Sequence, residues 1–311
     1  MACTVGSNVL GLCRAASETC IAACAQAFIG VSDCKGRRLH MEDRHTILPD
    51  FQLSPTTSGI PHQFAAVYDG HCSARGSEHA ADRLHELLAE QPEIQTCQGM
   101  REVDDTAIQR AFARAFHEMD LEMVDVASAA GQQYGTTAVC ALRIGRLMYI
   151  AHTGDSCALL CRGGTLVRLT EDHKPASMPT ERARIEGQGG RIMYKEDRVL
   201  SNPRGSRISR LNMSRALGDG NFKSPKRLVE ATPDVVRVAL RPHRDQFFIL
   251  ASDGVLEVMS EDEAIDIVKT TVAGSPPSDA LAGQAAAALI RRATALQTRD
   301  NMTAVVVLLE W

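Results

Sequence analysis

The sequence predicts an α+β fold in which two antiparallel sheets pack face to face and carry helices on their outer faces. Between residues 135 and 170, short apolar runs are joined by tight turns, as in an antiparallel meander. Two pairs of segments are typical of helices: 74–90 with 104–126, and 260–272 with 279–296. Strands that alternate with such helix pairs favour two sheets, each covered by one pair.

The first elements follow from local sequence signals. We expect the compact part of the chain to begin with a strand at 28–33. Residues 48–62 contain three prolines with Ser, Thr and Gly, and therefore predict a loop. The apolar run 64–68 ends in Asp69-Gly70-His71, which predicts a buried strand and then a sharp turn that Gly70 permits.

The later elements are predicted in the same way. In 104–126, apolar residues recur every three or four positions, and Ser260 with Glu263 forms a capping box that opens a helix. Residues 175–210 carry many Arg, Gly and Pro residues and little periodicity beyond a short helix near 180–187, so we expect a functional excursion from the core. Further strands are expected at 135–142, 147–152, on both sides of Gly163-Gly164, at 247–251 and at 302–309.

Composition excludes several classes of protein. The 311 residues are 44% hydrophobic, enough for a large core, and the formal net charge of −4 gives no electrostatic reason to expect nucleic acid as the main partner. No window approaches the ~20 apolar residues that a membrane span needs. Ten cysteines scattered through a long chain are typical of a reducing compartment, so we expect a cytoplasmic protein, with a nuclear location as an alternative.

Residues 1–27 are expected to form a Cys-containing tail. They carry four cysteines but only Arg14 and Glu18 as charges, and they lack the basic start of a signal peptide. A loose or weakly helical tail is the favoured interpretation. S-palmitoylation of one or more cysteines, which would give weak membrane association, is the alternative.

Acidic residues stand at the ends of several predicted strands. Asp69 and Asp253 each follow an apolar run, and Asp300 precedes one. Carboxylates that converge at one rim of a sheet repel one another unless a cation lies between them. Oxygen ligands without a nearby His/Cys cluster favour Mg²⁺ or Mn²⁺ over Zn²⁺.

Two further features belong with these acids. Arg37 and Arg38 lie close before Glu42 and Asp43, which suggests either a surface ion-pair cluster or an oxyanion-binding arginine beside acids that hold water on metal ions. Asp155 follows the predicted strand 147–152 and is a fourth acid at a strand end.

The ordered set of motifs resembles the metal-dependent serine/threonine protein phosphatases of type 2C (PPM class) from about Phe28 to Trp311. The matching pieces are Arg38 with Met41-Glu42-Asp43, Asp69-Gly70-His71, Gly135-Thr136-Thr137-Ala138, Gly154-Asp155-Ser156, Asp172-His173-Lys174-Pro175, Ser214-Arg215-Ala216-Leu217-Gly218-Asp219, Ser252-Asp253-Gly254 and Asp300-Asn301-Met302. The resemblance implies a four-layer α-β-β-α sandwich, a catalytic domain at 28–311 with a flap at about 175–210, and a dinuclear metal centre at one edge. Cys157 departs from the pattern, because the family usually has Arg at that position.

The resemblance also implies roles for individual residues. Two Mg²⁺ or Mn²⁺ ions would be bridged by Asp69 and further held by the Gly70 carbonyl, Asp253 and Asp300. Glu42 and Asp43 would act mainly through bound waters, and Asp155 with Asp253 would form a weaker third site. Arg38 would hold the substrate phosphate. A metal-bridging hydroxide would attack phosphorus while His71 protonates the leaving oxygen, a role that typically contributes about 10²–10⁴-fold.

The expected activity is hydrolysis of phosphoserine and phosphothreonine in signalling proteins, by a monomer. Two other functions compete with this one. Cys140 and Arg146 match the C-x5-R pattern of cysteine phosphatases, but the match straddles an apolar strand and a turn. A pseudophosphatase that binds partners without turnover is the alternative of another class, although every metal-site acid is present. A secondary hypothesis makes Cys72, beside the proposed general acid, sensitive to peroxide.

Overall fold

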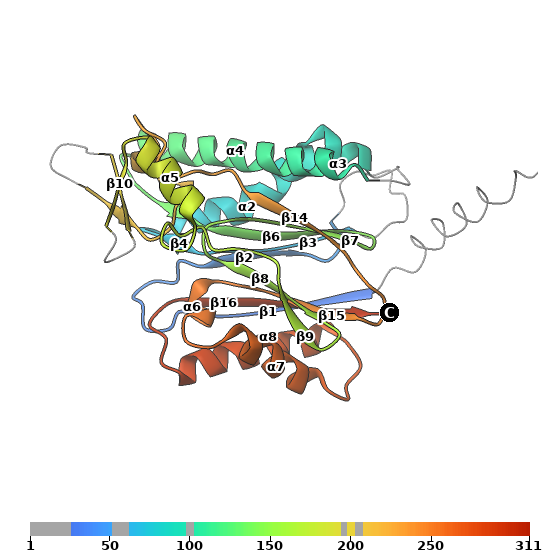
Figure 1. The fold of residues 1–311 in the computed structure, drawn as a ribbon. Coiled ribbons are helices and arrows are strands. Elements are labelled where there is room, and N and C mark those ends of the chain that lie inside the picture. Colours follow the sequence, from blue (N-terminus) through green and yellow to red (C-terminus); the bar gives the residue numbers. More distant parts are fainter. Residues whose placement is uncertain (1–25, 52–61, 98–102, 194–197, 203–207) are drawn as a thin grey trace, which may run out of the picture.

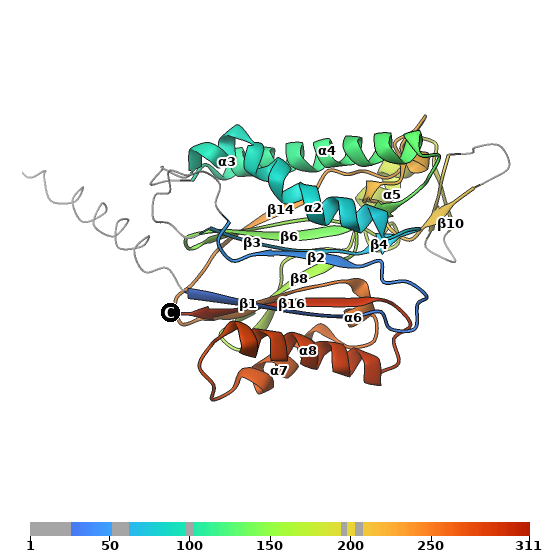
Figure 2. The same cartoon turned by 180° about the vertical axis from the view of Figure 1, so that it is seen from behind.

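The computed structural model describes residues 26–51, 62–97, 103–193, 198–202 and 208–311. Two five-stranded antiparallel sheets lie face to face between layers of helices (Figures 1 and 2), which confirms the predicted α-β-β-α architecture. One sheet runs in the order β1 (Gln26–Cys34), β16 (Met302–Glu310), β15 (Asp245–Ala251), β8 (Cys157–Arg162), β9 (Thr165–Arg168). The other runs in the order β14 (Asp234–Ala239), β7 (Leu147–Thr153), β6 (Ala138–Ile144), β3 (His62–Tyr68), β2 (Arg44–Leu48).

Helices cover the outer face of each sheet. The β14-containing sheet is covered by α2 (Arg75–Glu90), α3 (Pro92–Cys97) and α4 (Asp105–Ala129). The β1-containing sheet is covered by α7 (Glu261–Val272) and α8 (Asp279–Ala295), with the one-turn α6 (Asp253–Leu256) at its edge. The Ser260 hydroxyl accepts from the Glu263 amide at the start of α7, which confirms the Ser260 half of the predicted capping box, whereas the Glu263 side chain pairs with Arg292.

The core of the sandwich has three apolar layers. One lies between the two sheets, and one lies between each sheet and the helices that cover it. Alternate residues of β16 pack into different layers: Val305 and Val307 lie between the sheets, whereas Ala304 and Val306 face the helices. This explains why the strand is apolar at nearly every position instead of alternating. None of the helices in the described part of the chain is long and apolar enough to cross a membrane.

Two small sheets extend from the sandwich, and they correct parts of the sequence prediction. The single strand expected at 135–142 is divided into β5 (Gly135–Thr136) and β6, because the Thr137 backbone and side chain both bond Asp69 instead. A small sheet joins β13 (Leu217–Gly218), β5 and β4 (Gly70–His71). Beyond the expected helix α5 (Pro179–Gly187), the excursion holds a second small sheet of β10 (Arg191–Met193), β11 (Arg198–Leu200) and β12 (Arg210–Leu211).

Candidate metal centre

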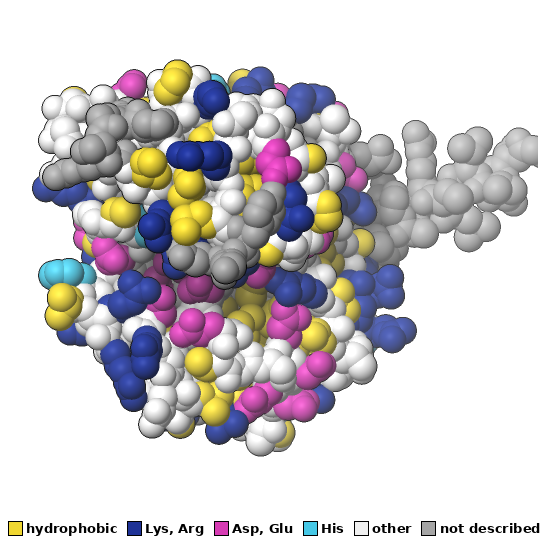
Figure 3. Space-filling model, turned by 60° about the vertical axis from the view of Figure 1, so that its left-hand side comes forward, with side chains coloured by type: hydrophobic (Ala, Val, Ile, Leu, Met, Phe, Trp, Pro, Cys, Tyr) yellow, Lys and Arg dark blue, Asp and Glu magenta, His cyan; other side chains and the backbone are white. Residues whose placement is uncertain are grey.

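The topology brings the strand-end acids to one edge of the sandwich. Antiparallel pairing of β15 with β16 places Ala251 opposite Ala304, so Asp253 and Asp300 lie at the same end of that sheet. In the other sheet, Asp69 follows β3, and Asp155 lies on the connection from β7 to β8 that passes between the sheets. Figure 3 looks onto this edge and shows acidic side chains gathered in a hollow between the two halves of the molecule.

Asp155 is buried, Asp69, Asp253 and Asp300 are partly buried, and the four carboxylates repel one another. Burial, and then the charges of Asp155 and Asp300, raises the pKa of Asp253 to about 7. Burial also raises the pKa of Asp69 well above its ordinary value, and the charges of Asp43 and Asp253 add to this effect. Ionised carboxylates at such positions need a positive charge between them, and an all-oxygen set suits a hard divalent cation. The residues present therefore fit the metals that the sequence implies.

Asp43 and Glu42 are anchored to the same edge. Asp43 Oδ2 accepts hydrogen bonds from Ser252 Oγ at 2.7 Å and from Thr303 Oγ1 at 2.9 Å. Burial nevertheless raises the pKa of Asp43 to about 6. The Glu42 amide donates to Asn301 Oδ1 at 2.7 Å, so the loop that carries both acids is fixed to the start of β16.

Asn301 and Gly70 shape the surroundings of this loop. Asn301 Nδ2 donates to the carbonyl oxygens of Lys35 and His40, at 2.8 and 3.0 Å. A Cβ on Gly70 would lie 2.4 Å from the Glu42 carbonyl oxygen, so this position admits only glycine without displacement of the loop. The close approach of the two segments explains why a glycine follows Asp69.

Asp155 has one oxygen bound and one free. Its Oδ2 lies 3.0 Å from Lys174 Nζ and 3.5 Å from Asn212 Nδ2. Its Oδ1 is buried and has no hydrogen-bond partner among the residues that the structure describes. A buried carboxylate oxygen without a donor is expensive to leave unpaired, so this atom is a suitable ligand for a cation.

The histidine expected to act as an acid has a carboxylate partner that the sequence analysis did not single out. His71 Nε2 lies 2.7 Å from Asp219 Oδ2, and the Asp219 side chain is only 4% exposed. Burial opposes the charged form of the ring, but the charge of Asp219 and its hydrogen bond raise the pKa of His71 overall. A Cβ on Gly135 would lie 2.3 Å from Asp219 Oδ2 and 2.6 Å from His71 Nε2, so a glycine makes room for the pair.

Arg38 lies at the rim of the acidic hollow. Its Nη2 is 2.5 Å from Asp300 Oδ2, and its side chain is 52% exposed. The structure therefore places the arginine expected to bind phosphate against an acid expected to bind metal. An exposed guanidinium at this position can release the carboxylate and bind a phosphate in its place. A guanidinium binds two oxygens of a planar carboxylate or of a tetrahedral phosphate with two parallel hydrogen bonds.

In the described part of the chain, no three of the acids at this edge have their carboxylate oxygens within 4.8 Å of one another. Among the residues that the structure describes, one group of three potential metal ligands has its ligand atoms within 4.8 Å of one another. This group is His152, His173 and Asp234. The acids at the edge are spread more widely. This arrangement agrees better with more than one cation along the edge than with one compact site.

The cysteines do not support a thiolate mechanism. Cys140 is fully buried on β6, and burial raises the pKa of its thiol, so it is not a nucleophile at neutral pH. Cys72 is exposed, but burial of its sulfur together with the charges of Asp219 and Glu42 raises the pKa of its thiol as well. Cys157 fills a core position under α7 and α8, so the departure from the family pattern is accommodated by packing.

Comparison with known proteins gives a consistent result. Residues 28–302 match the family model described as "Protein phosphatase 2C". The chain is 35% identical over 301 residues to "Probable protein phosphatase 2C 24" of Arabidopsis thaliana, covering 89% of this chain and 77% of that protein. It is 32% identical to the "Integrin-linked kinase-associated serine/threonine phosphatase 2C" of Rattus norvegicus, covering 89% and 71%. The crystal structure of a serine-threonine phosphatase 2C from Toxoplasma gondii superposes with a TM-score of 0.76 at 27% identity, covering 91% of this chain and 95% of that one.

Proposed function

Because the chain belongs to the protein phosphatase 2C family and is thus a metal-dependent serine/threonine protein phosphatase, we propose which of its own residues carry out the hydrolysis. The partly buried, mutually repelling acids at one edge of the sandwich carry this proposal. Two Mg²⁺ or Mn²⁺ ions would be held by Asp69, the Gly70 carbonyl, Asp253 and Asp300, with Glu42 and Asp43 acting mainly through water. A weaker third ion would be held by Asp155 with Asp253. When bound, such cations lower the pKa of water and offset the charge of the phosphate.

Arg38 is proposed to bind the phosphate of the substrate. It is exposed, and it reaches the acidic hollow from the outside, where a phosphorylated side chain would enter. Its ion pair with Asp300 keeps the guanidinium positioned at the hollow. A phosphate that replaces this carboxylate as its partner would be oriented by two parallel hydrogen bonds.

His71 is proposed to protonate the leaving serine or threonine oxygen. Its Nε2 is occupied by Asp219, and its Nδ1 is buried without a hydrogen-bond partner among the described residues. The proton would therefore leave from Nδ1, while Asp219 keeps the ring oriented and stabilises its charged form. Asp219 is thus a positioning residue for the general acid.

The remaining proposals concern the setting of the enzyme. We propose a catalytic domain over 28–311 with a flap at about 175–210, preceded by the tail 1–27. The expected loose or weakly helical form of this tail and the acylation of its cysteines concern residues 1–25, which lie outside the described part of the chain. The five cysteines whose state the structure gives are free thiols, which supports a reducing compartment such as the cytoplasm. We also propose that the protein acts as a monomer, in phosphorylation signalling.

Hydrolysis of a phosphothreonine peptide tests the proposal directly. With Mn²⁺ or Mg²⁺ we expect turnover that EDTA abolishes and vanadate does not, because vanadate traps enzymes that use a cysteine nucleophile. Turnover that survives EDTA would refute the metal assignment. Measurable metal binding without turnover under either ion would favour the pseudophosphatase alternative.

A further inference from the structure

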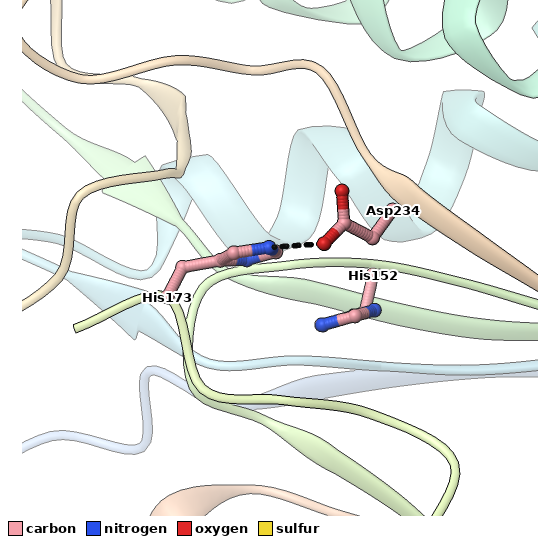
Figure 4. A group of neighbouring side chains, drawn as sticks. All are labelled: His152, His173 and Asp234. Carbon is pink, nitrogen blue, oxygen red and sulfur yellow. Dashed lines mark hydrogen bonds and ion pairs between the residues drawn. The ribbon is translucent and has the colours of Figure 1, made fainter. Parts of the chain in front are cut away.

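A stacked histidine pair lies behind the Asp155 turn. The rings of His152 and His173 are parallel within 12°, with centroids 4.6 Å apart, and Asp234 lies beside them (Figure 4). His173 Nε2 is 3.2 Å from Asp234 Oδ2, and His152 Nε2 is 2.9 Å from the Glu171 carbonyl oxygen. Both histidines are almost completely buried.

This trio is close enough for a metal site, but its chemistry is that of a hydrogen-bonded support. The Gly154 amide donates to His173 Nδ1 at 3.1 Å, so the proton of the neutral ring is on Nε2, where it bonds Asp234. His173 therefore has no free lone pair. Parallel rings also direct their nitrogen lone pairs along parallel planes, which do not converge on one ion. Arg215 further supplies a positive charge to Asp234, at 2.8 Å.

His173 holds the Asp155 turn through two hydrogen bonds to one residue. Its ring accepts from the Gly154 amide, and its own amide donates to the Gly154 carbonyl oxygen at 3.0 Å. The next residue, Lys174, bonds Asp155 Oδ2. Gly154 has φ of +103°, and a Cβ there would lie 2.6 Å from Thr137 Cγ2, so the turn is closely fitted on its other side as well.

The ring of His173 is connected through Asp234 to the excursion that carries α5. Arg215 bonds Asp234 Oδ1 through Nη1 and Glu181 Oε1 through Nη2, at 2.8 and 3.1 Å. Glu181 lies on α5, and Arg184 of the same helix bonds its Oε2 at 2.8 Å. Burial alone would raise the pKa of Glu181, but these two arginines lower it to about 2, so the pairs are ionised at neutral pH.

We propose that His173 is a positioning residue for Asp155, and that the Arg215 ion pairs couple this turn to helix α5. The inference rests on the proposed role of Asp155 as a ligand of the weaker cation site. A shift of α5 changes the Arg215–Asp234 contact, and hence the orientation of the His173 ring and the Gly154 amide that it holds. The backbone before Asp155 then loses its fixed direction. The excursion thereby sets how well the weaker cation is bound.

The test uses the full chain and Mn²⁺ alone, with free Mn²⁺ measured by electron paramagnetic resonance. Asp155→Asn should abolish the weaker class of Mn²⁺-binding sites, and this loss shows which part of the binding curve belongs to Asp155. Arg215→Gln should weaken that class about 10-fold, as is typical when an outer partner of a metal ligand is lost, and leave the tighter class unchanged. Hydrogen–deuterium exchange of the peptide containing Gly154 should become faster in Arg215→Gln without any metal.

Arg162→Gln is the matched control. Arg162 pairs with the buried Asp245 at 2.6 Å, and its side chain is 19% exposed, compared with 16% for Arg215. Within the described part of the chain its hydrogen bonds go to Asp245 and to the Ala239 carbonyl, away from the Asp155 turn, so it should reproduce a general loss of stability but neither the binding change nor the exchange change. Equal effects of the two arginine variants on Mn²⁺ binding and exchange would overturn the proposal.

The remaining outcomes also decide the question. If Arg215→Gln does not fold, Asp234→Asn removes the charge but keeps an oxygen for His173, and the same changes in Mn²⁺ binding and Gly154 exchange are expected. Unchanged exchange in that variant would overturn the coupling, and unaltered Mn²⁺ binding in Asp155→Asn would overturn the cation role. Failure of the proposed function is seen separately, as absence of metal-dependent phosphopeptide hydrolysis by the unmodified chain.

Discussion

Replacing Asp219 with asparagine should slow phosphopeptide hydrolysis by acting through His71. The hydrogen bond between His71 Nε2 and Asp219 Oδ2 is 2.7 Å long, and the side chains are 19% and 4% exposed. Asparagine keeps the shape of the carboxylate but removes the charge that stabilises a protonated ring. Gly135 lies against both groups, so there is little space for water to replace the lost charge.

The size of the effect follows from the type of hydrogen bond. A hydrogen bond to a charged group contributes about 1.5–3 kcal/mol, and about 1.4 kcal/mol corresponds to tenfold in rate. Asp219→Asn should therefore lower kcat on a phosphothreonine peptide by about 10- to 100-fold. His71→Asn removes the proposed general acid itself and should cost about 10²–10⁴-fold. The Asp219 effect must be the smaller of the two.

The assay compares the peptide with p-nitrophenyl phosphate, whose phenolate leaves without needing a proton. On this second substrate Asp219→Asn should change kcat by less than about 3-fold. In the His71→Asn background, Asp219→Asn should add no further loss, because a positioning residue has nothing left to position. Equal losses on both substrates, or additive losses in the double variant, would refute the reasoning.

Four further predictions follow from the edge of the sandwich and the excursion. Asp300→Ala should abolish metal-dependent turnover, a larger loss than the ~10–100-fold decrease in activity that is typical when a residue that only supports a metal ligand is removed; unchanged activity would refute the assignment of Asp300 as a ligand. Gly70→Ala should destabilise the fold by about 1–3 kcal/mol in thermal unfolding, because its Cβ would lie 2.4 Å from the Glu42 carbonyl oxygen, whereas Gly187→Ala, with open space around it, should not. Removing divalent cations should lower the melting temperature, since a cation at 100 times its Kd stabilises by about 2.7 kcal/mol, and an unchanged melting temperature would count against the site. Glu181 has its pKa lowered from 4.5 to about 2, so its stabilisation is complete above pH 4.5 and is lost as the pH falls through about 2; urea titrations should show a steeper loss of stability over this range in the unmodified chain than in Glu181→Gln.

The long, regular elements could be predicted from the sequence because their signals are local. Residues 104–126 show the helical spacing, and the structure places α4 at Asp105–Ala129 with Asp104 as its cap. The strand at 302–309 corresponds to β16. The prediction of one strand at 135–142 was wrong because Thr137 bonds Asp69, which is distant in the sequence. Strands of two or three residues, such as β10 to β12, carry no periodicity from which they could be predicted.

The site was predictable only to the extent that its residues carry chemistry on their own. Acids at strand ends are visible in a sequence, and the structure brings Asp253 and Asp300 to one edge. The partnership of Asp219 with His71 could not be predicted, although Asp219 belongs to the family-like motif 214–219, because a carboxylate after a short strand has no local signal that ties it to a distant histidine. Asn301 likewise gives no sign that its amide bonds three backbone groups of the 35–43 loop.

Asp155 is held in place differently from the other acids at this edge. Asp69 is fixed to one sheet, and Asp253 and Asp300 are fixed to the other, whereas Asp155 lies on the connection that passes between them. Its placement therefore cannot be set by the register of either sheet alone. Thr137 supports the connection from one side, since its hydroxyl lies 2.7 Å from Ser156 Oγ and accepts from the Asp69 amide, and His173 supports it from the other. Because one support is tied to Asp69 and the other to α5, the proposed coupling would let a change in the excursion move Asp155 without displacing Asp69, Asp253 or Asp300.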